Sequence, residues 1–153
     1  MYGILLIIHS LTRWLVLIFG LAAVGLATRG MISKSAFGSN NNRAGLAYSI
    51  SMDIQLLLGL LLFFFFSPIT TSAFADPAGA MSSDVTRFWL AEHFPLMLFA
   101  LVLIHVGRSR AKKAEGDTKK HRTALIFYGI SFLLILAAIP WPFLSYGRAL
   151  LPF

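Results

Sequence analysis

The chain has 153 residues, of which 58% are hydrophobic and only 12% are charged. Soluble domains carry about 25% charged residues, so this composition excludes a soluble globular fold. The net charge is +7, but the basic residues lie between apolar stretches, which favours membrane topology over nucleic-acid binding as the cause. The sequence has no cysteine, so disulfides, iron–sulfur clusters and haem attached through cysteine are excluded, and any metal must be held by histidine or carboxylate.

Four apolar runs have about the length needed to cross a bilayer as helices. Only a helix or a closed barrel satisfies its own backbone hydrogen bonds within lipid. We therefore predict an all-α integral membrane protein, a four-transmembrane-helix bundle that forms a single membrane domain over residues 1–153. The spans are expected at about residues 4–27, 44–66, 85–107 and 123–139.

The charges of the connections predict the orientation of the spans. The first and third connections are rich in lysine and arginine, whereas residues 67–84 carry Asp76 and Asp84 and no basic residue. Cytoplasmic loops of membrane proteins are enriched in basic residues. We expect a multi-pass protein of the bacterial inner (cytoplasmic) membrane, with its basic loops in the cytoplasm and both termini on the outer, periplasmic side.

The first span carries His9 and Arg13, which lie four positions apart and share one helix face. Charged groups at membrane depth are costly unless they have a partner or a function. The same face continues with small side chains, which are Val16, Gly20, Ala23 and Ala27. Such a stripe lets another helix or a flat cofactor approach closely, and helix packing is the favoured interpretation.

The second span contains Asp53 and Gln55 in an otherwise apolar sequence. Residues two apart on a helix point in nearly opposite directions, so these two cannot form one site. Two roles of Asp53 stay open. The carboxyl is hydrogen-bonded to Ser131 or Tyr128 on a neighbouring helix, or it serves as a proton relay or a quinone contact.

The third span follows an outer loop, residues 67–84, and begins at a helix-start signature, Ser82-Ser83-Asp84. It holds a second histidine, His93, close to a proline. Pro95 cannot donate a hydrogen bond to the Ala91 carbonyl, so we expect the helix to kink or loosen beside His93.

Two further expectations concern the neighbours of His93. Glu92 is expected to pair with Arg13, which would neutralise both charges in the low-dielectric interior. His105 lies about 120° around the helix from His93, so these two histidines cannot serve one site.

The connection between spans three and four, residues 108–122, is short and strongly basic. A short connection predicts that these two spans are antiparallel neighbours. His121 lies in this connection, and we interpret it as a solvated or lipid-headgroup residue rather than a ligand.

Topology brings His9 and His93 to matching depth. They lie about 7 and 8 residues inside the outer starts of their spans, which places both roughly 10 to 12 Å below the outer boundary. Two facing histidines in a four-helix bundle are what a six-coordinate b-type haem needs, each imidazole being an axial ligand of the iron. The competing interpretation is an accidental match in depth, with both histidines hydrogen-bonded inside the bundle.

The anionic propionates of a haem would need cationic partners near the interface. Arg13, Arg87 and Arg148 are the candidates. Arg13 lies deeper than His9, so Arg87 and Arg148 are the better ones. The predicted cofactor site thus comprises His9, His93 and the three arginines, with the two histidines as the metal ligands.

Several segments together resemble small bacterial four-span membrane proteins that are labelled cytochrome b. They are His9-Ser10 with Arg13-Trp14, Asp53-Ile54-Gln55-Leu56-Leu57-Leu58-Gly59, Arg87 with Glu92-His93, Lys120-His121, and Ile139-Pro140-Trp141-Pro142. The resemblance runs across nearly the whole chain and implies haem b and electron transfer. Large cytochrome b proteins hold two haems through two same-helix histidine pairs, which this chain lacks, so one haem is expected.

These observations favour a small haem b-binding membrane subunit that relays electrons or contacts quinone within a larger respiratory or photosynthetic complex. Its partners would be other membrane subunits and lipids, with no soluble substrate, and a non-catalytic subunit is expected rather than a stand-alone enzyme. One alternative is a haem-free accessory subunit that stabilises a larger membrane complex. Another is a proton or solute conductor that uses Asp53, although the chain lacks the broken helices and inverted repeats of transporters.

Overall fold

The computed structural model describes residues 1–151, and all regular elements in that part of the chain are helices. Four helical stretches are long and apolar enough to cross a membrane, namely Tyr2–Ser33, Ser39–Phe66, Asp84–Lys113 and Asp117–Ala138. The length and composition of these helices confirm the predicted four-span, multi-pass membrane protein. The individual elements are α1 (Tyr2–Ser33), α2 (Ser39–Leu61), η1 (Leu62–Phe66), α3 (Pro68–Ala75), α4 (Pro77–Ser82), α5 (Asp84–Arg87), η2 (Phe88–His93), α6 (Phe94–Lys113) and α7 (Asp117–Ala138).

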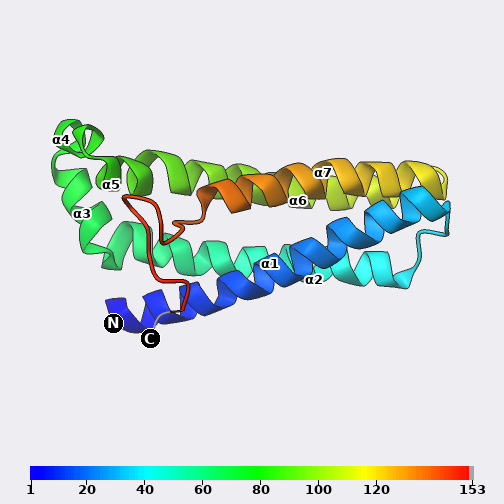
Figure 1. The fold of residues 1–153 in the computed structure, drawn as a ribbon, viewed down its shortest axis with the longest axis horizontal. Coiled ribbons are helices and arrows are strands. Elements are labelled where there is room, and N and C mark those ends of the chain that lie inside the picture. The colour runs from blue at the N-terminus through cyan, green and yellow to red at the C-terminus, as the bar shows by residue number, and fades with distance from the viewer. Residues whose placement is uncertain (152–153) are drawn as a thin grey trace.

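The four long helices form a bundle in which each one packs against two neighbours, in the order α1, α2, α6, α7 (Figure 1). Helices α6 and α7 are antiparallel neighbours, as their short connection predicts. The N-terminus, the described segment after α7 and the short helices α3 to α5 lie at one end of the bundle, called here the terminal end. The α1–α2 and α6–α7 connections lie at the opposite end, called here the basic end.

The connection between the second and third spans is helical, so the predicted loop over residues 67–84 is wrong. Helices α3 and α4 each begin with a proline, Pro68 and Pro77, at the first helical position. Proline suits that position because its missing N–H would have no partner there. The carboxylate of Asp76 caps α4 by accepting a hydrogen bond from the Gly79 backbone N–H at 3.0 Å.

The bundle core forms where small residues of α1 meet large residues of α2 and α7. The predicted packing stripe is confirmed, since Val16, Gly20, Ala23 and Ala27 are all buried. A Cβ atom at Gly20 would lie only 2.9 Å from the ring of Tyr48 and would also clash with Phe132. Glycine is therefore what allows these helices to approach so closely.

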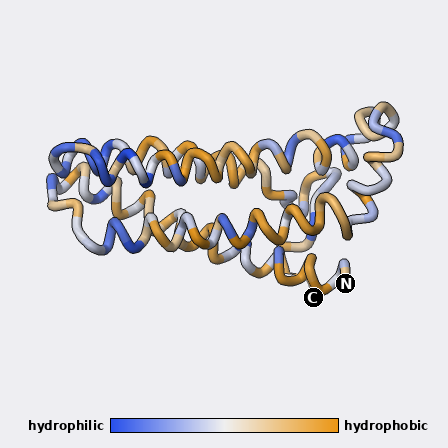
Figure 2. Tube along the Cα trace, turned by 180° about the vertical axis from the view of Figure 1, so that it is seen from behind, coloured by the Kyte–Doolittle hydropathy of each residue, from blue (hydrophilic) through white to orange (hydrophobic). Residues whose placement is uncertain are grey.

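The outward surface of the long helices is apolar. Large side chains such as Leu21, Leu57, Phe99 and Leu133 are more than half exposed. Figure 2 shows hydrophobic residues along the middle of the bundle and hydrophilic ones concentrated at the basic end. A soluble protein rarely exposes so much contiguous apolar surface, whereas lipid tails cover it without cost.

Candidate functional site

His9 and His93 face each other inside the bundle, near the terminal end. Their ring centroids are 6.5 Å apart and their ring planes are inclined by 64°. Both rings line one cavity of about 100 Å³, whose walls come from all four long helices and from the segment after α7. The structure thus brings together the two histidines that the sequence analysis selected by depth.

A widened helical turn places His93 at the cavity. Residues Phe88–His93 form the π-helical segment η2, directly before Pro95. Pro95 has no N–H to offer the preceding turn, which is the reason for the expected loosening. The expectation is confirmed, and π-helical turns of this kind are frequent at functional sites.

The imidazole of His93 is oriented by a backbone carbonyl. Its Nδ1 lies 2.8 Å from the carbonyl oxygen of Ala138, the last residue of α7. A helix end leaves such carbonyls without an intrahelical partner. When Nδ1 donates this bond, Nε2 carries the lone pair, which is the arrangement that orients most metal-binding histidines.

The ring of His9 is enclosed, but one of its nitrogens lacks a hydrogen bond within the described residues. Its Nδ1 is buried and has no hydrogen-bond partner within residues 1–151. Its backbone carbonyl accepts a hydrogen bond from the Gln55 side-chain amide at 2.9 Å, and the Gln55 carbonyl oxygen in turn bonds the Thr12 hydroxyl. A Cβ atom at Gly59 would lie 3.3 Å from Cε1 of His9, so a glycine leaves the space that the ring occupies.

Two arginines line the same cavity. Arg13 is buried, and one of its terminal nitrogens donates to the Leu150 carbonyl at 2.6 Å, while its Nε has no partner in the described chain. Arg148 donates to the Tyr2 hydroxyl at 3.3 Å, and its guanidinium stacks over the ring of Trp89 at 5.0 Å. In residues 1–151, neither guanidinium pairs with a carboxylate.

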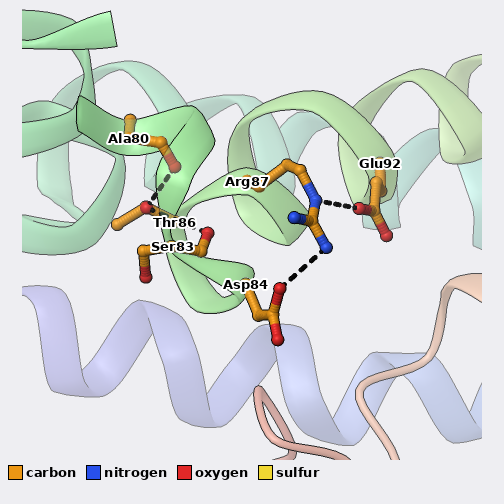
Figure 3. A network of polar contacts seen from close by, with 6 residues as sticks. All are labelled: Ala80, Ser83, Asp84, Thr86, Arg87 and Glu92. Atoms are coloured by element: carbon orange, nitrogen blue, oxygen red, sulfur yellow. Dashed lines mark hydrogen bonds and ion pairs between the residues drawn. The ribbon is translucent and has the colours of Figure 1, made fainter. Parts of the chain in front are cut away.

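Arg87, the third arginine of the predicted site, lies elsewhere. It forms ion pairs with Asp84 at 2.9 Å and with Glu92 at 3.0 Å (Figure 3), and it is not among the described residues that line the cavity. The expected pairing of Glu92 with Arg13 is therefore wrong. In a π-helical turn residues five apart come together, which brings Glu92 to Arg87 instead.

Asp53 belongs to a second polar pair, on the outer surface of the bundle. Its carboxylate lies 2.8 Å from Nε2 of His105, and both side chains are nearly half exposed. The expected hydrogen bonds of Asp53 with Ser131 or Tyr128 are wrong. Ser131 hydrogen-bonds the Tyr48 hydroxyl in the buried core, and the ring of Tyr128 packs on that of Tyr48. The predicted separation of His105 from His93 is confirmed, since His105 pairs with Asp53 and does not line the cavity of His93.

His121 is buried, so its interpretation as a solvated residue is wrong. Only 1% of it is exposed, and its ring packs on Phe37 with centroids 4.9 Å apart. Its Nε2 lies 3.1 Å from the Ser35 carbonyl oxygen. Space for the ring exists because Gly30 of α1 has no side chain, and any Cβ atom there would overlap the imidazole.

The spacing of His9 and His93 suits a metal ion held between them. An imidazole nitrogen binds a metal at about 2.0 Å, so two rings on opposite sides of one ion have centroids roughly 6.3 Å apart. No group of three or more metal-binding side chains occurs within the described residues.

The sequence did not predict two hydrogen bonds that hold residues of this site, those of Gln55 with His9 and of Leu150 with Arg13. Gln55 stands out as polar in an apolar span, but its bond to the carbonyl of His9 depends on how α1 and α2 pack. The contact of Leu150 with Arg13 depends on the path of the chain after α7, for which the sequence holds no periodic signal.

Comparisons of the chain with known protein families, with curated proteins and with solved structures find no match.

Proposed function

We propose that the protein is a small electron-transfer subunit that holds one haem b between His9 and His93. The observation that carries the proposal is the 6.5 Å spacing of the two rings, close to that of two imidazoles on opposite sides of one metal ion. The hydrogen bond from Nδ1 of His93 to Ala138 supports it, because it leaves Nε2 available as a ligand.

The remaining residues of the cavity suit the other parts of a haem. Leu6, Val16, Leu56 and Ile135 give it apolar walls that exclude water. Arg13 and Arg148 have no carboxylate partner in the described chain and would bind the propionates, so we assign this role to them rather than to Arg87. A haem held by His9 and His93 would supply one-electron redox chemistry.

The cavity must enlarge for a haem to enter. Its volume is about 100 Å³, whereas pockets for small molecules usually measure about 300–1,000 Å³. The segment after α7 contributes Pro140 and Arg148 to the cavity wall, and its Leu150 carbonyl accepts a hydrogen bond from Arg13. We propose that this segment moves away when the cofactor binds, which frees Arg13 for a propionate.

The pair of Asp53 and His105 supports a contact with quinone. Ionisable side chains at membrane depth are rare and mark functional positions. This pair is partly exposed on the outer surface of the bundle, where large apolar side chains such as Leu57 and Phe99 are also exposed. A quinone ring that diffuses in the bilayer would find there both a hydrogen-bond donor and an acceptor.

We further propose that the subunit belongs to a larger respiratory or photosynthetic complex of the bacterial inner membrane. The basic end would face the cytoplasm and the terminal end the periplasm, by the distribution of lysine and arginine. Partners would be other membrane subunits, because the described chain has only short connections outside its long helices.

The second candidate function is that of a haem-free accessory subunit. The small volume of the cavity favours it, since the histidines would then serve only to join α1, η2 and α7. A reduced-minus-oxidised absorption spectrum of the purified protein separates the two functions. A Soret band with a sharp reduced α-band is expected for the haem subunit, and their absence would assign the accessory role.

A further inference from the structure

A basic hollow lies at the basic end of the bundle, far from the histidine cavity. Its volume is about 410 Å³, and four cationic side chains line it, namely Arg43 of α2, Arg108 and Lys112 of α6, and Lys120 of α7. Phe37 and Leu46 add apolar surface. The hollow thus gathers cations from three helices around one space.

Among residues 1–151, the four cations have no partner in an ion pair. The ion pairs found within residues 1–151 involve other residues. Asp117 contacts Phe37, one of the lining residues, and its carboxylate accepts a hydrogen bond from the Phe37 backbone N–H at 3.0 Å. Like charges held together repel each other, so an anion in the hollow would relieve that repulsion.

Arg108 lines the hollow and carries a side-chain nitrogen that lacks a hydrogen bond within the described residues. Its Nε is shielded from solvent and has no hydrogen-bond partner in the described chain. Leaving a buried donor unpaired costs free energy, more so when the group is charged. A phosphate oxygen is the natural partner, because guanidinium groups bind phosphate through paired N–H donors.

The surface next to the hollow identifies the source of the phosphate. Leu46 of α2 lines the hollow and is 40% exposed, and Ile50, one turn further along the same helix face, is 48% exposed. This apolar stripe of α2 continues from the hollow toward the middle of the bundle. A free phosphate would not use that apolar surface, whereas the acyl chains of a lipid would cover it.

We propose that the basic hollow is a binding site for the phosphate headgroup of an anionic phospholipid, with the acyl chains lying along α2. Basic pockets between helices at a membrane interface are suited to anionic lipid headgroups. The site does not depend on haem, since it shares no residue with the histidine cavity.

The test uses the full-length protein in nanodiscs of phosphatidylcholine to which phosphatidylglycerol is added in steps. Bound lipid is counted by native mass spectrometry after release into detergent, and the midpoint of thermal unfolding is recorded at each step. We expect phosphatidylglycerol to be retained and to raise the midpoint, and phosphatidylcholine alone to do neither. Equal retention of the two lipids would overturn the proposal.

Matched variants locate the site. Arg108→Gln should weaken phosphatidylglycerol binding about tenfold or more, because it removes a charge-assisted bond. Arg29→Gln removes one charge from an exposed position that does not line the hollow, and should change binding less than about twofold. If Arg108→Gln does not fold, Lys112→Gln replaces it. Equal effects of the variants inside and outside the hollow would contradict a specific site.

A second arm distinguishes the two sources of phosphate. Inorganic phosphate is added to the protein in a neutral detergent without phosphatidylglycerol. We expect no shift of the unfolding midpoint at millimolar concentrations. A saturable shift that Arg108→Gln abolishes would show that the hollow takes free phosphate, and would overturn the lipid assignment.

Discussion

The imidazole of His9 on the first span faces that of His93 on the third span, with their ring centroids 6.5 Å apart. One ring is held by the Ala138 carbonyl, and the other has a buried nitrogen without a partner in the described residues. A pair built only for packing would satisfy both rings, because an unpaired buried donor or acceptor costs about 1–3 kcal/mol. This asymmetry adds to the ring spacing as support for the ligand hypothesis.

Replacing either histidine tests this relationship directly. His9→Ala and His93→Ala should each abolish the low-spin haem spectrum, because the loss of one axial ligand leaves the iron five-coordinate or the site empty. His105→Ala is the control and should leave the spectrum intact, since His105 pairs with Asp53 on the outer surface. The measurement is the absorption spectrum of purified protein. Retention of the low-spin spectrum in His93→Ala would exclude His93 as a ligand.

The arginines should differ in their effect on haem retention. Arg13→Gln and Arg148→Gln should each increase haem loss, because both side chains line the cavity. Arg87→Gln should have little effect, because Arg87 pairs with two carboxylates outside it. Haem transfer to an acceptor protein, followed over time, measures the difference. A larger loss in Arg87→Gln would reverse this assignment.

A bulkier residue beside His9 should close the cofactor site. In Gly59→Val the new side chain would press against Cε1 of His9, since even a Cβ atom lies at 3.3 Å. We expect the haem content to fall while the helix content measured by circular dichroism is kept. Gly25→Val is the matched control, because a Cβ atom at Gly25 meets nothing within 4 Å. Equal haem content in both variants would argue against a site at His9.

A side chain at Gly30 should destabilise the basic end. Gly30→Val would overlap the buried ring of His121, and overpacking of this kind costs about 1–3 kcal/mol. The midpoint of thermal unfolding in detergent should fall relative to the wild type. Gly25→Val again serves as the control for valine in α1. An unchanged midpoint would show that His121 can leave its place at little cost.

The carboxylate of Asp53 should matter for quinone rather than for folding. Asp53→Asn keeps a hydrogen bond to His105 possible, so the assembled complex and its unfolding midpoint should change little. Electron transfer between the complex and quinone should fall severalfold, because the amide cannot exchange a proton. His105→Gln should act in the same direction. Unchanged turnover in both variants would assign the pair to packing alone.

The sequence by itself was sufficient to predict four spans, their antiparallel order and the loosened turn at Pro95. Span length follows from bilayer thickness, and the absent N–H of a proline acts on its own helix, so both effects are local. The stripe of small residues in α1 was predictable for the same reason, because helical periodicity decides which residues share a face. The depth of His9 and His93 also follows from chain position alone.

Only the tertiary structure decided which polar side chains meet. Asp53 bonds His105 and not Ser131, Glu92 bonds Arg87 and not Arg13, and His121 is buried beside Gly30. Each outcome depends on the rotation of one helix against another, or on a π-helical turn that shifts the register of the residues in it. Interhelical rotation arises from the packing of whole helix faces, so no short motif encodes it.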